Sequence, residues 1–446
     1  MRDKQHERPT AASPGFCGRY ADDSGHLVDF LARTEDELRA VPPKGERDER
    51  QTAVADEAHR TARRARHRFV EAHAEHVYRE LTDDRKAFLR LDDLAYQASE
   101  LLPGLVPTKE RIEEERALPQ GAKDGREIDQ GIFFWGLLRS CAAGRHLMDA
   151  MRRPTLRALA ALPGFRDNGY VELGLVSVRR DGDVAEVTVD NHEFLNAEDD
   201  LLVADLEVAV DLVLLDDSVR VGVMRGAPMR HPRYAGRRVF SAGINLTRLY
   251  QGDISLLDFF LGRELGYINK IFRGITVADA AGDWLDEPVE KPWIGVVDTF
   301  AIGGGAQILL CFDHVVATDE AYFTLPALKE GIIPGAANLR LPRQAGTRLS
   351  RQSILHNRRI DAASAEGALL VDAVVAPDRV EGAVSAVAEE LANPAVIANR
   401  RMLNQHEEPA DVFRQYMAAY ALEQSRRLYS SDLVANLERT WISRNR

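Results

Sequence analysis

The chain has 446 residues, which fits two or three domains of ~150 residues or one large α/β unit with a helical extension. Hydrophobic residues make up 45% and charged residues 29%, so whole-chain disorder and a collagen-like fibre are excluded. The net charge of −12 argues against a nucleic-acid binder, because affinity for the phosphate backbone comes from Lys and Arg. A local basic pocket for a small anion stays compatible with this charge.

The cysteines and the apolar segments indicate where the protein works. The chain contains three cysteines, at Cys17, Cys141 and Cys311. Their odd number and wide spacing match neither a zinc site nor a disulfide framework and suit a reducing cytosol. The longest apolar stretch, residues 294–312, has the length of a membrane span, but an aspartate, a glutamine and consecutive glycines interrupt it. We therefore expect a cytoplasmic protein with no membrane partner.

The first third of the sequence is helical in character. Residues 46–162 are rich in Ala, Arg, Glu and Leu, and apolar residues recur at helical spacing within 88–102 and 132–151. His73 and His76 lie among Arg, Glu and Ala, which is more typical of a solvated helix face than of a metal-ligand pair. No cluster of two histidines and a carboxylate is visible, so the sequence is compatible with a protein without a metal and leaves open ligands assembled by the fold.

Strands and helices alternate after residue 164. Two β-rich segments, 170–178 and 185–190, flank an Asp-Gly pair and predict a hairpin. Helices predicted over 201–215 and 255–273 alternate with strands predicted over 219–225 and 292–298. Such alternation predicts an α/β architecture, and the segment from 377 to 446 returns to helices.

The most informative segment is residues 302–307, Ile-Gly-Gly-Gly-Ala-Gln, between a predicted buried strand and a predicted helix. Glycine lets the backbone approach a ligand closely, and a helix N-terminus presents unpaired N–H donors. The segment is therefore either an anion or oxyanion site or a tight strand-to-helix turn. Its glycine spacing matches neither a P-loop nor a dinucleotide fingerprint.

A second segment, residues 237–246, reads Arg-Arg-Val-Phe-Ser-Ala-Gly-Ile-Asn-Leu and taken alone is an ordinary loop. The two segments together resemble the crotonase (enoyl-CoA hydratase/isomerase) superfamily. The resemblance continues through residues 311–317, 321–323 and 329–335 to Leu-Pro-Arg at 341–343, and covers roughly 169–377.

This resemblance implies the fold and the general chemistry. It implies an α/β fold with a crotonase-like spiral of ββα units, a large helical N-terminal domain and C-terminal helices. We place the N-terminal helical domain at 1–168, the acyl-CoA-binding core at 169–377 and the C-terminal helical region at 378–446. The superfamily binds acyl-CoA thioesters and holds the thioester oxygen with two backbone N–H groups, which match Ile244 and Gly304.

Two departures from the hydratase pattern limit the reactions that the site could catalyse. Where family hydratases carry catalytic glutamates, this chain has Gln307 and Ala327. Neither side chain can exchange a catalytic proton at neutral pH, so water addition by the family mechanism is not expected. The chemistry left to the site needs an enolate but no adjacent carboxylic acid.

Gln307, the Ser-Ala-Gly-Ile-Asn sequence and the helical N-terminal region resemble a narrower group within the superfamily. These are the cofactor-independent dioxygenases acting on 3,5-dihydroxyphenylacetyl-CoA, in the pathway that supplies dihydroxyphenylglycine to glycopeptide antibiotics. The resemblance implies O2 as co-substrate, 3,5-dihydroxyphenylglyoxylate and CoA as products, and no metal, flavin or haem. It also implies a homo-oligomer, either a trimer or a pair of trimers.

The same resemblance implies some of the binding residues. Glu198 and Arg263 match positions at the phenolic hydroxyls, and Ala242, Ile244 and Leu246 match positions that hold the adenine end of CoA.

For other candidates the sequence leaves two roles open. Ile333 is either a wall of an O2 pocket or ordinary core, and Arg237 and Arg238 either bind CoA phosphates or are solvated surface residues. His192 and Phe194 are candidates for the border of the pantetheine, and Gly243 and Asn245 are further CoA-binding candidates in the same loop.

The residues themselves support the two charged positions only weakly. Glu198 lies in Asn-Ala-Glu-Asp, which also fits a helix N-cap with acids in the first turn. Arg263 lies off the apolar stripe predicted for the helix 255–273, and Glu264 falls nearer its middle.

Two alternatives stay open. The chain could be another crotonase-type acyl-CoA enzyme, such as a thioesterase, decarboxylase or isomerase, and consumption of O2 would discriminate. It could also be a non-catalytic acyl-CoA-binding protein. The group that removes the α-proton and the ring substitution of the substrate are not identified by the sequence.

Overall fold

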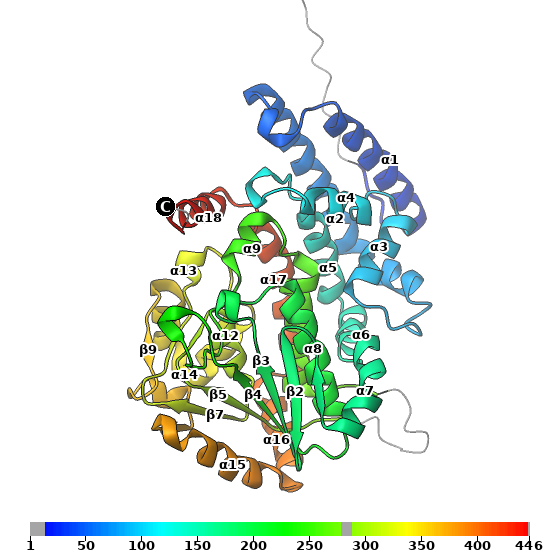
Figure 1. The fold of residues 1–446 in the computed structure, drawn as a ribbon. Helices are drawn as coiled ribbons and strands as arrows, with labels where there is room; N and C mark the ends of the chain where they lie inside the picture. The colour runs from blue at the N-terminus through cyan, green and yellow to red at the C-terminus, as the bar shows by residue number, and fades with distance from the viewer. Residues whose placement is uncertain (1–13, 278–287, 445–446) are drawn as a thin grey trace, which may run out of the picture.

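The computed structural model describes residues 14–277 and 288–444. Its first part is helical, as expected (Figure 1). The helices are α1 (Tyr20–Arg39), α2 (Glu49–Leu81), α3 (Leu91–Leu101), α4 (Lys109–Arg116), α5 (Glu127–Arg139), α6 (Cys141–Met151) and α7 (Leu156–Asn168). The helix predicted over 132–151 is two helices, because Ser140 is extended and its hydroxyl accepts the N–H of Ala143 to cap α6.

The expectation of a solvated histidine face on α2 is wrong for His73. This side chain is buried, and its Nε2 lies 2.8 Å from a carboxylate oxygen of Asp23 on α1. The contact joins two helices inside the core, where a buried polar group must be hydrogen-bonded. Within the described ranges no helix is long and apolar enough to span a bilayer.

A seven-stranded sheet forms the centre of the molecule. Its order is β1 (Tyr170–Glu172), β2 (Val176–Asp181), β3 (Val184–Val189), β4 (Val221–Gly226), β5 (Trp293–Val297), β7 (His314–Thr318) and β10 (Ala373–Val375). The predicted hairpin is confirmed, because Asp181 pairs with Val184 across the Gly182-Asp183 turn. From β3 to β10 all neighbouring strands are parallel.

A smaller sheet contains β6 (Phe300–Ile302), β8 (Tyr322–Thr324) and β9 (Ile360–Asp361). The chain passes from the large sheet to the small one and then into a helix, twice in succession. The first unit is β5, β6 and α12 (Gly304–Leu309), and the second is β7, β8 and α13 (Ala327–Glu330). This confirms the predicted spiral of ββα units.

Helices cover both faces of the large sheet (Figure 1). One face packs against α8 (Asp200–Leu215), and the other packs against α15 (Val380–Leu391). Val221 and Val223 on β4 contribute to the core under α15, whereas the alternate residue Met224 joins the main core. This alternation follows from the two-residue period of a strand.

The C-terminal helices are α16 (Ala395–Glu407), α17 (Ala410–Arg427) and α18 (Ser431–Arg444). Helix α17 packs closely along α5, and a Cβ at Gly131 of α5 would collide with Ser425 of α17. The helical N-terminal part and the C-terminal helices thus pack together through α5 and α17. The division into three domains at residues 168 and 377 stays a prediction.

Candidate functional site

Three extended segments end at one edge of the small sheet. The Ile302 N–H of β6 donates to Ser241 O at 2.9 Å, which aligns residues 241–244 with β6. The Gly303 N–H donates to Thr324 O at 2.8 Å, which aligns β6 with β8. Because these segments run parallel, the residues that follow them meet at the same edge. The two segments singled out by sequence are therefore adjacent.

Two backbone donors at this edge have no partner among the described residues. Glu198 N–H donates to Gly243 O at 2.7 Å and Asn245 N–H donates to Glu198 O at 2.8 Å, which leaves the Ile244 N–H unused. Across the described ranges, neither the Ile244 nor the Gly304 N–H has a hydrogen-bond acceptor. Both residues line the same small pocket of about 30 Å³.

The pocket combines an apolar wall with four polar side chains. Phe259, Phe260, Ile332, Ile333 and Pro334 supply the apolar wall. The polar side chains are Arg263, Glu264, Gln307 and Glu330, and Tyr420 from α17 completes the lining. The C-terminal helices thus contribute to the site directly, which the sequence did not indicate.

Arg263 lies at the centre of a buried network, only 3% exposed. Its Nε donates to Glu198 Oε2 at 2.6 Å and its Nη1 donates to Glu264 Oε1 at 2.9 Å and to Gln307 Oε1 at 2.7 Å. Its Nη2 donates to Glu198 Oε1 at 3.2 Å and to Gly304 O at 2.8 Å. All five N–H groups of the guanidinium are therefore occupied.

The electrostatics of Arg263 follow from these partners. Burial by itself lowers the pKa of Arg263, but the charge of Glu198 and its other neighbours raises that pKa well above its ordinary value. Glu198 also accepts the hydroxyl of Tyr267 at 3.0 Å. The buried cation is tolerated here because buried carboxylates pair with it and accept its hydrogen bonds.

The inference that Arg263 lies off the buried face is wrong, because this segment is buried on all sides. The predicted helix 255–273 is a π-helical turn (Leu256–Leu261), then α10 (Gly262–Leu265) and α11 (Tyr267–Arg273), with a break at Gly266. All residues from 263 to 272 are buried, so an apolar stripe does not separate a buried face from an exposed one here.

The helix N-cap suggested for Glu198 belongs to its neighbour. Asp199 accepts the N–H of Leu202 at 3.1 Å and caps α8. Before it, Leu195 and Asn196 adopt left-handed conformations, and the Asn196 side chain donates to Val189 O and Val239 O. This loop directs Glu198 inward, where it is 2% exposed.

The Gln307 side chain bridges a guanidinium and a carboxylate. Its Oε1 accepts from Arg263, and its Nε2 donates to Glu264 Oε1 at 2.5 Å. Glu264 also accepts the Ala336 N–H at 3.2 Å. Gly335, with φ of +45°, passes against this pair, and a Cβ there would collide with Glu264. Glu264 and Gly335 are site residues that the sequence reasoning missed.

Glu330 is a further residue without an assigned role. It ends α13, is partly buried and lines the pocket with Ile244 and Gly304. Among the residues described, its carboxylate has no hydrogen-bond or ion-pair partner. Burial raises the pKa of Glu330 to about 7. An acid just before Gly-Ile-Ile-Pro-Gly is the sequence signal that could have found it.

The predicted CoA-binding residues lie along the loop that leads to Ile244. Arg237 pairs with Glu320 at 2.6 Å on the surface, and Arg238 donates to Gly226 O at 3.0 Å. The Ala242 N–H donates to Leu195 O, and the Gly243 N–H donates to Ser241 Oγ. None of these four residues lines the pocket.

Four other predicted residues flank the same loop. Asn245 caps α9 (Leu246–Gln251) by accepting the N–H of Arg248 at 3.2 Å, and Leu246 begins that helix. His192 Nδ1 lies 3.1 Å from an Asp190 carboxylate oxygen. The Arg248 guanidinium lies over the Phe194 ring, with its Cζ 6.0 Å from the centre of that ring. None of these four residues lines the pocket either.

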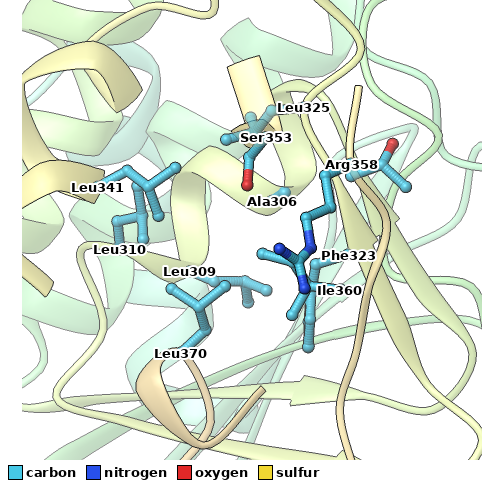
Figure 2. A pocket seen from close by; sticks show the side chains of 11 residues that line it. Ala306, Leu309, Leu310, Phe323, Leu325, Leu341, Ser353, Arg358, Ile360 and Leu370 are labelled. Atoms are coloured by element: carbon cyan, nitrogen blue, oxygen red, sulfur yellow. The ribbon is translucent and has the colours of Figure 1, made fainter. Parts of the chain in front are cut away.

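A second, apolar pocket borders α12 (Figure 2). Ala306 and Leu309 of α12 line it together with Leu310, which caps the C-terminus of that helix, and Ser353 and Arg358 are among its few polar side chains. None of the site residues predicted from the sequence lines it. Helix α12 thus presents Gln307 to the polar network and its apolar residues to this second pocket. In the part of the chain that the structure describes, no group of His, Cys, Asp and Glu could hold a metal ion.

Comparison with known proteins agrees with this geometry. The family model described as enoyl-CoA hydratase/isomerase matches residues 284–430. A probable enoyl-CoA hydratase from Rhizobium meliloti (strain 1021) is 31% identical over 51% of this chain and 80% of its own length. The chain belongs to the enoyl-CoA hydratase/isomerase, or crotonase, family.

One relative is similar over almost the whole chain. The (3,5-dihydroxyphenyl)acetyl-CoA 1,2-dioxygenase from Amycolatopsis orientalis is 50% identical over 97% of this chain and 98% of its own length. This similarity includes the helical N-terminal part. A solved enoyl-CoA hydratase from Mycobacterium avium subsp. paratuberculosis K-10 has a TM-score of 0.49 and 23% identity, covering 60% of this chain and 99% of that chain.

Proposed function

We propose that the chain is a cofactor-independent dioxygenase that converts 3,5-dihydroxyphenylacetyl-CoA and O2 to 3,5-dihydroxyphenylglyoxylate and CoA. The observation that carries this proposal is the 50% identity to a named dioxygenase over nearly the full length of both chains. The pocket supports it, because two unpartnered N–H groups face a site in which an amide stands at the hydratase glutamate position.

The first chemical requirement is an enolate. The substrate's α-carbon lies between an aromatic ring and a thioester, so loss of its proton gives a delocalised carbanion. The N–H groups of Ile244 and Gly304 form the oxyanion hole that holds the thioester oxygen as negative charge develops. One such donor typically contributes about 2.7–4 kcal/mol to transition-state stabilisation.

The enolate then reacts with O2 directly. It transfers one electron to triplet O2, and the resulting radical pair combines into an α-peroxide. The terminal peroxide oxygen attacks the thioester carbonyl and expels the CoA thiolate. The cyclic peroxide opens as its O–O bond breaks and the second α-hydrogen leaves as a proton. Both oxygen atoms end in the α-keto acid, and the thiolate gains one proton.

Gln307 suits this sequence because a neutral amide hydrogen-bonds without supplying a proton to the carbanion. Glu198 and Arg263 bind the phenolic hydroxyls, and Ile333 forms part of the apolar wall that receives O2. All five N–H groups of Arg263 are occupied in this structure, so a phenol oxygen replaces one of the present acceptors.

The CoA moiety lies along the loop before α9. Arg237 and Arg238 bind its phosphates, while Ala242, Gly243, Asn245 and Leu246 hold its adenine end. His192 and Phe194 border the pantetheine. The protein functions as a homo-oligomer, a trimer or a pair of trimers.

The decisive test compares anaerobic with aerobic incubation of chelator-treated protein and 3,5-dihydroxyphenylacetyl-CoA. Free thiol, O2 uptake and product mass are measured together. We expect one O2 consumed for each CoA released, and both atoms of ¹⁸O2 in the keto acid. Equal CoA release without O2 would indicate a thioesterase, and binding without any release would indicate a non-catalytic protein.

A further inference from the structure

We propose that Glu330 is the base that removes the α-proton of the acyl-CoA substrate. This inference rests on the proposed function and deepens it, because the enolate has so far had no group to generate it. Glu330 lines the same pocket as the two oxyanion donors, Ile244 and Gly304. A base must lie within reach of the proton while the donors hold the carbonyl oxygen two bonds away.

The fold places Glu330 beside the donors through the pairing of β6 with β8. Gly303 follows β6 and donates to Thr324 at the end of β8, and α13 carries the chain on to Glu330. A Cβ built at Gly303 would lie 3.4 Å from Glu330 Oε1 and 3.5 Å from Oε2. The carboxylate therefore packs against the residue that immediately precedes the Gly304 donor.

The other carboxylates in or beside the pocket are less suited to take a proton. Glu264, which lines the pocket, accepts hydrogen bonds from Arg263 and Gln307. Glu198, which does not line it, accepts hydrogen bonds from Arg263 and Tyr267. The oxygens of these two carboxylates are therefore already engaged as hydrogen-bond acceptors. By contrast, the Glu330 carboxylate accepts none from the described residues.

Burial supports the same assignment, because it raises the pKa of Glu330 to about 7. A general base works best when its pKa lies near the operating pH. The charged and titratable groups that face α13 and the pocket come from α10, α17 and α18. They are Arg263, Glu264, Tyr420, Arg427 and Asp432.

The proton balance is closed without another reagent. A C–H bond of the α-carbon breaks, an O–H bond forms on Glu330, and the electron pair moves into the enolate held by the oxyanion hole. No oxidation occurs until the enolate passes an electron to O2. The protonated Glu330 then returns its proton to the CoA thiolate and, as a carboxylate again, accepts the second α-hydrogen as a proton when the cyclic peroxide opens. Release of this proton to solvent restores the carboxylate for the next turnover.

The test measures proton removal separately from oxygenation. Under anaerobic conditions in D2O, NMR follows deuterium entering the α-position of 3,5-dihydroxyphenylacetyl-CoA for the wild type and for Glu330→Gln. We expect the substitution to slow exchange ~10²–10⁴-fold, the usual contribution of a general base. Aerobic CoA release should fall by the same factor. The matched control is Lys329→Gln, an exposed neighbour on α13 that does not line the pocket and should exchange normally.

Three further measurements separate the possible outcomes. An inert thioether analogue should bind Glu330→Gln and the wild type alike, which shows that the pocket is intact. Formate should restore exchange to Glu330→Ala by replacing the missing carboxylate. Exchange by Glu330→Gln within a few-fold of the wild type, or no rescue by formate in a variant that binds the analogue, would overturn the assignment. A wild type that neither exchanges the proton nor consumes O2 would instead overturn the proposed function itself.

Discussion

The Gln307 side chain donates from Nε2 to Glu264 Oε1 at 2.5 Å while its own Oε1 accepts from Arg263 at 2.7 Å. The position that carries a catalytic glutamate in family hydratases is thus fixed as an amide between a carboxylate and a guanidinium. A glutamate there would place two carboxyl oxygens in contact, and one of the two groups would have to keep a proton.

The substitution Gln307→Glu should therefore divert the reaction. The carboxyl pair would retain a proton beside the carbanion and return it before O2 reacts. We expect slower oxygenation and faster wash-in of solvent deuterium at the α-carbon, measured by O2 uptake and NMR. Unchanged oxygenation with no added wash-in would count against this role for Gln307.

Removal of the buried guanidinium should destabilise the fold. Arg263→Met leaves Glu198 and Glu264 buried without their cation, and breaking such a pair typically costs about 3–5 kcal/mol. The matched control is Arg237→Met, because Arg237 pairs with Glu320 on the surface, where an ion pair contributes about 0–1 kcal/mol. Urea unfolding of both variants compares the free energies of unfolding. Equal losses in the free energy of unfolding would show that the Arg263 network stabilises the fold no more than a surface ion pair does.

The stability of the protein should depend on the ionisation of Glu330. Its pKa is about 7 in the folded protein against an ordinary value of 4.5 for a solvated glutamate, so the folded protein binds this proton more tightly than the unfolded chain. Its contribution to stability is fully present below pH 4.5 and is lost as the pH rises through 7. The amide side chain of the variant Glu330→Gln does not ionise. The Tm of this variant minus the Tm of the wild type should therefore increase between about pH 5 and pH 8. Melting curves at the two pH values check this, and a constant difference would contradict it.

The oxyanion hole can be tested through the ligand, because its donors are backbone groups. Replacing the thioester C=O by CH2 removes the oxygen that Ile244 and Gly304 hold, while the CoA contacts remain. A stable enolate mimic on the same CoA should bind much more tightly, since transition-state-like ligands exploit contacts that the ground state makes weakly. Calorimetry gives both dissociation constants. Equal affinities would show that the two N–H groups do not form a working oxyanion hole.

Cofactor independence predicts the effect of metal removal. Protein treated with a chelator and free of flavin absorbance should release CoA at the full aerobic rate. The measurement compares treated and untreated protein, with metal content determined by mass spectrometry. Recovery of activity only after iron or copper is added would refute a cofactor-free reaction.

The amino-acid sequence alone predicts the class of fold and the two segments that bring Ile244 and Gly304 to the pocket. The glycines at 303–305 and the Ser-Ala-Gly-Ile-Asn loop are local signals, because only certain residues permit such close backbone approach. The spiral of ββα units, the Asp-Gly hairpin and the helical N-terminal part follow from periodicity and turn chemistry in the same way.

The tertiary structure, and not the local pattern, determines which side chains meet in the pocket. Periodicity placed Arg263 away from the buried face, because an apolar stripe marks a buried face only on a helix that also has an exposed one, and residues 263–272 are all buried. Glu330 reaches the site through strand pairing in the small sheet, and Tyr420 through the packing of α17. Their roles depend on contacts between segments far apart in the chain, and on the burial those contacts create, which local sequence patterns do not encode.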